Sequence, residues 1–465
     1  MNRFLKSPFW STFFYSAAIT VCALTGCAAP MSQTVQTVQT VKTAGAPAAN
    51  STEGPAIMNH IAESYVKLVL AVGQHDPDYV DAYYGPPEWK QQAEAGKRPL
   101  SEIRGEAASL LTDLRAHPVS AAGQDGESLR LRHEYLTRQI ESMVARVDLL
   151  AGKKMRFDEE SKALYDTVAP TYEESHFQGI VAELESLLPG GGSLADRLDA
   201  FRQAYVIPHD RLGRVFDAAI GECRRRTAEH IQLPAGESFV VEYVTGKPWS
   251  GYNWYKGSYH SVIQVNTELP IFIDRAVDLA CHEGYPGHHV YNSLLEQQMV
   301  KQRGWPEFTV YPLFSPQSLI AEGTANFGIE VAFPGAERVA YEKKALFPLA
   351  GLDPATAGRY YRVQELTQKL GYAGNEAARR YLDGTISREQ AVDWLMRYSL
   401  TPRDRSEQRV RFIERYRSYV INYNFGQDLV KGYVEKHGGT PDHPQERWRV
   451  FSELISSPRL PSGLR

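Results

Sequence analysis

Cysteine is scarce in this sequence, with four residues in a chain of 465. Cys22 and Cys27 lie within the first thirty residues, so the remainder of the chain has only Cys223 and Cys281. Two cysteines exclude a disulfide-stapled scaffold. They could pair with each other, but we expect both to be buried free thiols. Neither sign of charge is in large excess. The formal net charge is −4, which gives no reason to expect a nucleic-acid partner or an acidic polymer.

Several motifs are also missing. The chain has no G-x-S-x-G elbow, which argues against a serine hydrolase. The glycines at 190–192 precede Ser193 but lack the Lys-Ser/Thr ending of a phosphate-binding loop, so we interpret them as a loop and N-cap before a helix. We find no internal repeat of about 20–50 residues, the length that repeat architectures use. Hydrophobic residues at 43% and charged residues at 23% are the balance of a globular protein with a large core.

The first thirty residues have the anatomy of an export signal. Arg3 and Lys6 precede an apolar stretch that is too short and too rich in Ser and Thr for a membrane span. The stretch ends in L-T-G-C at residues 24–27, which resembles the lipobox of bacterial lipoproteins. This resemblance implies cleavage before Cys27 and a lipid on its thiol, and Ala28 implies the outer membrane of a Gram-negative bacterium, facing the periplasm. The alternatives are an ordinary signal peptide or a membrane anchor.

The rest of the chain divides into a tether and one domain. Residues 28–54 repeat small and polar residues and predict a flexible tether. Residues 55–465 have mostly helical periodicity, apart from two β-branched stretches, "SFVVEYV" and "SVIQVNT", between 238 and 267. The predicted fold is mainly α, with a small β-sheet inserted just before a helical segment at 270–301. "SVIQVNT" is also a candidate edge strand for an extended peptide, although it could be an ordinary sheet strand.

The stretch "ACHEGYPGHH" at 280–289 concentrates the chemistry of the sequence. His282 and Glu283 match the start of the zinc-protease signature H-E-x-x-H, which places two imidazoles on one face of a helix. The position of the second histidine is Pro286, which can neither bind metal nor donate an amide hydrogen to His282. We therefore expect a bulge or kink that brings His288 to the place of the second ligand. His289 points about 100° away on a resumed helix, so we take it as a supporting or substrate-contacting group. The spacing leaves the reverse assignment open.

A third ligand should come from a separate element. Glu322, in "SLIAEGTANFGIE", lies on a helix predicted to begin near residue 319. Its small neighbours, Gly323 among them, would let this helix approach the metal-binding turn closely. Glu330 and Glu337 are weaker candidates, because Glu330 lies about two turns further on and Glu337 follows Pro-Gly, where the helix should have ended.

These segments resemble the DUF885 family of bacterial proteins. "HEGYPGHHVYN" is similar to the family's H-E-x-x-P-G-H-H motif, and "AEGTANFG" is similar to its E-G-W-A segment, with Thr324 in place of the usual Trp. Residues 75–86, 219–227 and 416–430 also look like family segments, so the resemblance covers nearly all of the chain after the tether. The family is grouped with zinc metallopeptidases of the gluzincin type, in which a Glu from a following helix completes the site. The resemblance thus implies a Zn²⁺ cofactor and a peptide substrate.

What the resemblance implies is a zinc-dependent hydrolase. In this reading His282, His288 and Glu322 hold Zn²⁺, and Glu283 is the general base that moves a proton from water to the leaving amine. The oxyanion needs a further donor, for which we expect a tyrosine near the C-terminus and take Tyr433 as the catalytic candidate. The other candidate tyrosines of this segment are Tyr419 and Tyr423. The segment departs from the family pattern at Lys431, which stands where the family usually has Tyr.

Two further readings remain open. A non-catalytic lipoprotein, which binds a structural metal or a substrate without turning it over, would explain Pro286 and Thr324. Glu283 argues against it, because a structural site has no need of a carboxylate beside the metal. The same zinc chemistry could also act on another amide or ester, such as the stem peptides of the cell wall. The sequence does not fix the oligomeric state or the choice between endo- and exopeptidase.

Overall fold

The structure, a computed structural model, describes residues 53–465 except for 120–124 and 248. The predicted signal peptide at 1–27 lies outside the described residues, as does the predicted tether up to residue 52. Helix α1 (Glu53–Gly73) begins two residues before the predicted start of the domain. In the described part of the chain, no helix combines the length and the apolar character that crossing a bilayer requires.

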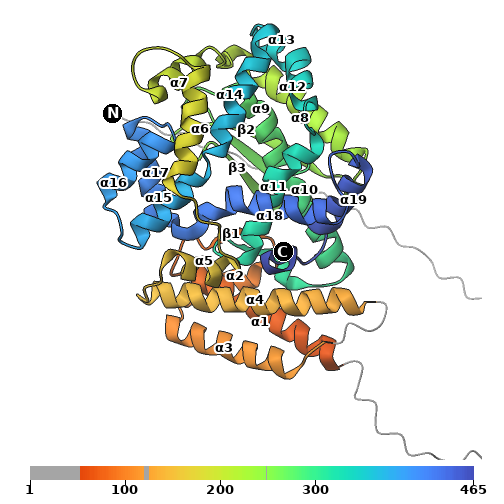
Figure 1. Ribbon diagram of the computed structural model, residues 1–465. Coiled ribbons are helices and arrows are strands. Elements are labelled where there is room, and N and C mark those ends of the chain that lie inside the picture. Colours follow the sequence, from red (N-terminus) through yellow and green to blue (C-terminus); the bar gives the residue numbers. More distant parts are fainter. Residues whose placement is uncertain (1–52, 120–124, 248) are drawn as a thin grey trace, which may run out of the picture. The chain divides into compact units, whose positions relative to one another are not determined.

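Helices form most of the described chain (Figure 1), and the prediction of a mainly α fold with small sheets is confirmed. The helices that follow α1 and precede the main sheet are α2 (Pro87–Ala95), α3 (Leu100–Ala116), α4 (Gly126–Leu150), α5 (Phe157–Tyr165), α6 (Glu174–Leu187), α7 (Leu194–Gln203) and α8 (Leu212–Ala228). The helices after that sheet are α9 (Asp274–Leu279), α10 (His288–Leu295), α11 (Pro316–Ala332), α12 (Glu337–Tyr341), α13 (Phe347–Ala350), α14 (Ala357–Lys369), α15 (Tyr372–Leu382), α16 (Arg388–Tyr398), α17 (Arg403–Tyr416), α18 (Ile421–Lys436) and α19 (Pro444–Ile455).

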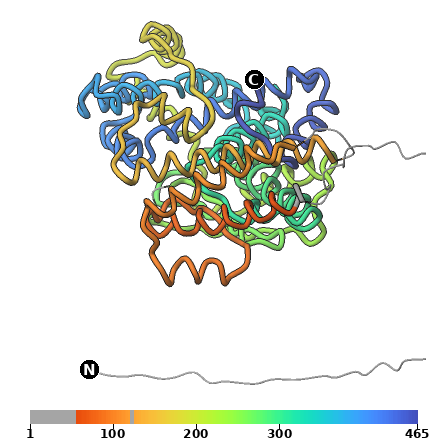
Figure 2. Tube along the Cα trace, turned by 90° about the horizontal axis from the view of Figure 1, so that it is seen from below, coloured from red at the N-terminus to blue at the C-terminus, as the bar shows by residue number. Residues whose placement is uncertain are grey.

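Helices α1, α3 and α4 pack together through apolar stripes. On α1, Ile61, Tyr65, Leu68 and Val72 are buried, and their spacing of three or four residues places them on one face. Figure 2 shows the red and orange segments of α1, α3 and α4 running side by side. The apolar periodicity of the sequence therefore corresponds to the face that each helix buries.

The main sheet is built from β2 (Ser238–Val244), β3 (Gly251–Gly257) and β4 (His260–Asn266) in the order β2-β4-β3. Strand β4, the "SVIQVNT" segment, pairs parallel with β2 and antiparallel with β3. Of the two alternatives for this segment, the ordinary sheet strand is confirmed and the edge strand is wrong. Its apolar residues Ile263 and Val265 are buried whereas β2 is largely exposed, which favours β4 as the central strand. A second, two-stranded sheet pairs β1 (Val80–Tyr83) with β5 (Val310–Pro312).

Helix α11 runs through the core and crosses α18 at close range. A Cβ atom on Gly323 would lie 2.5 Å from the backbone carbonyl carbon of Gly426, so the crossing requires glycine. The sequence predicted that Gly323 would let α11 approach the metal-binding turn, but Gly323 faces α18 instead. On the side of that turn, a Cβ on Gly328 would lie 3.0 Å from the ring of Pro286. Small residues on α11 therefore let it pack closely against two neighbours.

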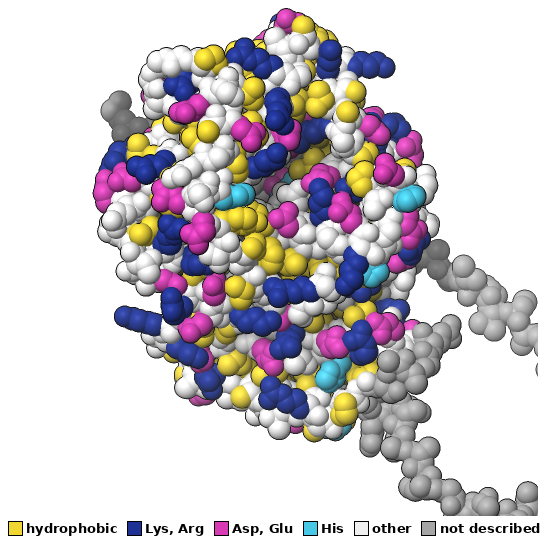
Figure 3. Space-filling view, viewed as in Figure 1, with side chains coloured by type: hydrophobic (Ala, Val, Ile, Leu, Met, Phe, Trp, Pro, Cys, Tyr) yellow, Lys and Arg dark blue, Asp and Glu magenta, His cyan; other side chains and the backbone are white. Residues whose placement is uncertain are grey.

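Charged side chains of both signs cover the surface. Figure 3 shows basic and acidic groups interspersed over the face drawn. Several belong to ion pairs one helical turn apart, such as Arg225 with Glu229 on α8 and the loop that follows it. Exposed pairs of this kind each contribute about 0.3–0.5 kcal/mol. The stability of the fold therefore depends mainly on the packing of the core.

Candidate metal centre

The predicted bulge is a widened turn between α9 and α10. Residues Ala280–Gly284 form a π-helical turn, η2. The backbone N–H of Tyr285 donates to the carbonyl of Ala280 at 3.0 Å, five residues earlier, where an α-helix would use the residue four earlier. The expectation of an irregular turn is confirmed. The wider turn accommodates extra residues between His282 and His288.

Pro286 and Gly287 reverse the chain between the two histidines. The bond between Tyr285 and Pro286 is cis, and the N–H of Gly287 donates to the carbonyl of Cys281 at 2.9 Å. A Cβ atom on Gly287 would lie 1.9 Å from the carbonyl oxygen of His282, so no larger residue fits here. Helix α10 then begins at His288. Gly287 is thus a requirement of the close turn.

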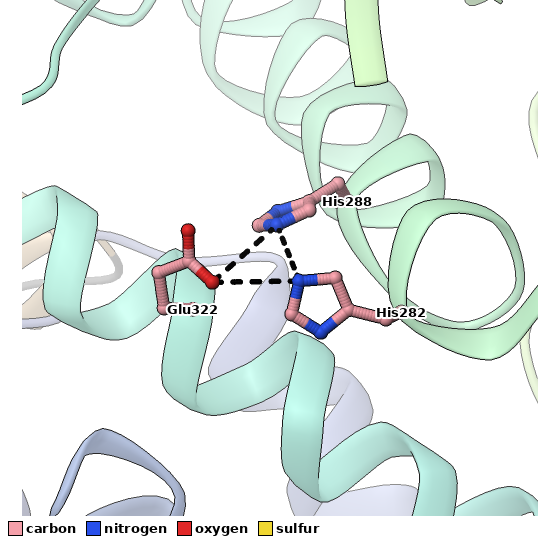
Figure 4. A group of neighbouring side chains, drawn as sticks. All are labelled: His282, His288 and Glu322. Carbon is pink, nitrogen blue, oxygen red and sulfur yellow. Dashed lines mark hydrogen bonds and ion pairs between the residues drawn. The ribbon is translucent and has the colours of Figure 1, made fainter. Parts of the chain in front are cut away.

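The turn and α11 bring three side chains together, as Figure 4 shows. The Nε2 atoms of His282 and His288 lie 3.2 Å apart. Glu322 places its Oε2 atom 3.4 Å from Nε2 of His282 and 3.9 Å from Nε2 of His288. One ligand atom from each residue lies within 4.8 Å of the others, so the group could hold a metal ion. The sequence predicted these same three residues.

The arrangement fits a tetrahedral ion. Zinc binds imidazole nitrogen and carboxylate oxygen at about 2.0–2.2 Å, which puts two ligand atoms of a tetrahedron about 3.3–3.6 Å apart. The observed separations of 3.2, 3.4 and 3.9 Å bracket this range. Oε2 of Glu322 is buried and has no hydrogen-bond partner among the described residues. A buried carboxylate oxygen without a donor is costly, and a cation between it and the two nitrogens would offset that cost.

Neighbouring side chains fix the orientation of the ligands. Nδ1 of His282 lies 3.0 Å from Oδ1 of Asn326, and Asn326 in turn donates to the carbonyl of Tyr423 at 3.0 Å. The hydroxyl of Tyr419 donates to Oε1 of Glu322 at 2.8 Å. An acceptor at Nδ1 leaves the lone pair of Nε2 for the metal. Asn326 was not predicted from the sequence, although its position four residues after Glu322 places it on the same face of α11.

The protonation states of His288 and Glu322 suit metal binding, whereas His282 must lose a proton that its raised pKa favours. Burial, helped by the charge of His282, lowers the pKa of His288 to about 4. In His282 burial acts in the same direction, but the close contact with Glu322 and the nearby carboxylates outweigh it and raise the pKa. Burial alone would raise the pKa of Glu322, yet the two histidines lower it. At neutral pH His288 is neutral and Glu322 is ionised, which are the forms that bind metal.

Glu283 is buried beside the group without belonging to it. Its side chain approaches β3, where a Cβ atom on Gly251 would lie 3.1 Å from Oε1 of Glu283. Its backbone carbonyl accepts a hydrogen bond from Asn253 at 2.7 Å. Burial, reinforced by the charges of Glu322 and Asp81, raises the pKa of Glu283 to about 7. A carboxylate with these properties can take and return a proton near neutral pH.

A half-buried pair, Tyr252 and Asp81, lies near Glu283. The hydroxyl of Tyr252, on β3, donates to the carboxylate of Asp81, on β1. Burial raises the pKa of Asp81 to about 6, although the bond from Tyr252 opposes this. The pKa of Tyr252 is raised by burial, then by Asp81, and further by Glu283 and Glu322. Neither residue was predicted from the sequence, although Asp81 lies within the family-like segment 75–86.

His289 faces the sheet rather than the metal group. Its Nδ1 lies 2.9 Å from Oγ of Ser261, and its Nε2 lies 3.0 Å from a carboxylate oxygen of Glu237. Tyr285 and Arg224 donate to the same carboxylate at 2.6 and 2.7 Å. The side chain of His289 is 1% exposed. The expected role of this histidine beside the metal or the substrate is not supported, because consecutive helical residues point in different directions.

The other candidate residues lie elsewhere. Glu330 accepts hydrogen bonds from Gln427 at 2.8 Å and from Lys431 at 2.9 Å. Lys431, which replaces the family's tyrosine, is therefore engaged in an ion pair. Glu337 begins α12 and pairs with Arg226 at 2.6 Å. Neither glutamate joins the metal group, in agreement with their lower ranking.

Tyr433 is not brought to the group. Its ring packs on His437, with 4.2 Å between centroids, and the guanidinium of Arg459 lies 5.7 Å from its centroid. Tyr423 lies ten residues earlier on α18, about 15 Å along the helix axis. The ring of Tyr423 packs on that of Tyr419, with 5.6 Å between centroids, and Tyr419 donates to Glu322, so Tyr423 lies on the side of the metal group. The prediction of Tyr433 depended on its place in the C-terminal segment and did not take the length of α18 into account.

Comparisons with known proteins found solved structures of low similarity. No protein-family model matches the sequence, and no curated protein matches it. A structure described as "the putative lipoprotein from Colwellia psychrerythraea" is 16% identical, with 79% of this chain and 72% of that chain covered and a TM-score of 0.47. Another, described as "The Structure of CHT", is 13% identical, with 87% and 92% covered and a TM-score of 0.47. At these values neither match carries an argument about the fold or the function.

Proposed function

We propose that this chain is a zinc-dependent hydrolase, and more specifically a peptidase. The observation that supports the proposal is the convergence of three ligand atoms from His282, His288 and Glu322 at the separations of a tetrahedral ion. The donor set of two imidazoles and one carboxylate is that of many catalytic zinc sites, which keep a fourth position for water. The glutamate that follows the first histidine stands where a base is needed.

In the proposed reaction Glu283 moves the proton, and Asn326 and Tyr419 orient the metal ligands. When bound, Zn²⁺ acts as a Lewis acid that makes water a better nucleophile and polarises a scissile carbonyl. Glu283 accepts the proton of the attacking water and delivers it to the leaving amine. Asn326 holds the ring of His282 so that Nε2 faces the site. Tyr419 binds Oε1 of Glu322 and leaves Oε2 free for the ion.

We propose Tyr423 as the donor that stabilises the oxyanion. Asn326 fixes the backbone of Tyr423 by a hydrogen bond to its carbonyl, and the charges of Glu322 and Glu283 both act on its hydroxyl. A donor that is held in place before the reaction stabilises developing negative charge most effectively. Tyr433, the choice from the sequence, would have to reach the group from the far end of α18.

The substrate in this proposal is a peptide. The turn that carries Glu283 lies against β3, which is an edge strand of the main sheet. Edge strands offer backbone groups to which an extended peptide can bind. The side chains of the three ligands are between 10% and 15% exposed, so the group is open to a small reactant. The proposal also includes the location: the lipobox-like segment and the export signal support an outer-membrane protein on the periplasmic side, with Cys27 as the lipid anchor.

A digestion experiment tests the proposal. The protein is incubated with a mixed peptide library in three states: as purified, after removal of metal by a chelator, and after addition of Zn²⁺ to the stripped protein. We expect new peptide termini in the first and third states and none in the second. Cleavage that is indifferent to the chelator, or no cleavage in any state, would contradict a zinc peptidase.

A further inference from the structure

Cys223 and Cys281 meet in the core beside the metal-binding turn. Their Sγ atoms lie 2.7 Å apart although 58 residues separate them in the sequence. Both residues are fully buried, and the structure records them as free cysteines. Cys223 lies on the inward face of α8, with Val215, Phe216 and Ala219. Cys281 lies on the π-helical turn η2, one residue before His282.

We propose that these two cysteines form a disulfide bond in the exported protein. They are the only cysteines of the domain, and they already face each other across two packed elements. Disulfides form and persist in the periplasm and in other oxidising compartments, whereas cytosolic thiols stay reduced. The proposal rests on the export signal and on this contact. It does not depend on zinc binding or catalysis, so it extends the proposed function without sharing its test.

The chemistry requires an oxidant that acts on the chain before it has packed. Each thiol gives up its hydrogen and one electron, and one S–S bond forms between the two sulfur atoms. A thiol oxidase that carries a disulfide accepts the two electrons and two protons and is left as a dithiol. Both sulfurs are inaccessible in the folded domain, so the exchange takes place during folding, before α8 covers η2.

The bond would anchor the turn that carries the metal ligands. The carbonyl of Cys281 already accepts the N–H of Gly287, and His282 is the next residue along the chain. A covalent link from Cys281 to α8 would hold this backbone in the geometry that directs His282 toward the ion. The link also closes a long loop, which restricts the unfolded chain more than a short loop does. We therefore expect both the metal turn and the whole domain to be stabilised.

Peptide mapping tests the proposal directly. The full-length protein, exported in a Gram-negative host, is unfolded in alkylating agent without reductant and digested with trypsin. Cleavage sites in the sequence release Cys223 in peptide 215–224 and Cys281 in peptide 276–301. We expect these two peptides joined, with a mass lower by two hydrogen atoms than their sum, and separate after reduction. Recovery of both as separate alkylated peptides from the exported protein would overturn the proposal.

Two controls separate the bond from its context. Protein that lacks residues 1–27 and is made in the cytosol should yield the separate alkylated peptides under the same handling. The variants Cys223→Ala and Cys281→Ala, exported in the same way, should unfold at a lower temperature than the wild type and lose bound Zn²⁺ to a chelator faster. If the joined peptide is found while the protein binds no zinc, the disulfide stands and the metal proposal fails.

Discussion

His282 and His288 point their Nε2 atoms at each other across 3.2 Å, although they are six positions apart in the chain. In H-E-x-x-H the two histidines are four residues apart and one regular helical turn suffices. Here the π-helical turn and the Pro-Gly reversal take up the extra residues. The proline that replaces the expected histidine is thus part of a longer path to the same arrangement of ligands.

Replacing Glu283 by glutamine should abolish hydrolysis and leave the metal in place. The change Glu283→Gln removes the proton acceptor but keeps the shape of the side chain. We expect kcat on a cleavable peptide to fall by about 10²–10⁴-fold. Zinc content, measured on the same preparation by atomic spectroscopy, should stay at the wild-type level. A variant that keeps full activity would show that Glu283 is not the base.

Two tyrosines on α18 should respond differently to loss of the hydroxyl. Tyr423→Phe removes the proposed oxyanion donor, so we expect kcat to fall by about 100-fold with little change in KM. Tyr433→Phe is the matched control at the other end of the helix and should keep kcat within a factor of two or so. Steady-state kinetics on one peptide measures both. The reverse pattern would restore the choice made from the sequence.

Asn326 should matter for metal affinity through His282. Asn326→Leu removes the acceptor at Nδ1, and loss of such a partner typically weakens metal binding by about 10–100-fold. Asn326→Asp keeps an acceptor at the same place and should retain most of the affinity. Competition with a chromogenic chelator measures both constants. Equal affinity of the leucine variant and the wild type would mean that Asn326 does not orient the ligand.

The crossing of α11 and α18 should not tolerate a methyl group. Gly323→Ala forces the helices apart, because its Cβ would lie 2.5 Å from Gly426, and we expect a loss of about 1–3 kcal/mol in the free energy of unfolding. Gly221→Ala is the control on α8, where a Cβ meets nothing within 4 Å, and it should stabilise the protein by about 0.5–1 kcal/mol. Thermal unfolding of the two variants and the wild type measures both changes in stability. A stabilised Gly323→Ala would contradict the described crossing.

The sequence predicted local features well and long-range contacts less well. His288 could be inferred because proline excludes a regular turn at residue 286, and Glu322 because a half-motif calls for a third ligand. The mainly helical fold follows from apolar spacing within each helix. The central place of β4 and the remoteness of Tyr433 depend on which elements pack together, and periodicity within one element does not encode this. Asn326 is recognised only once α11 lies against the metal turn.

The central claim is that His282, His288 and Glu322 form a zinc site, and metal analysis tests it most directly. Protein lacking residues 1–27 is equilibrated with Zn²⁺, freed of excess metal and assayed by atomic spectroscopy, together with His288→Ala and His289→Ala whose folding is checked by circular dichroism. We predict about one zinc per chain in the wild type and in His289→Ala, and almost none in His288→Ala. A wild-type chain without zinc, or equal zinc in the two variants, would contradict the account.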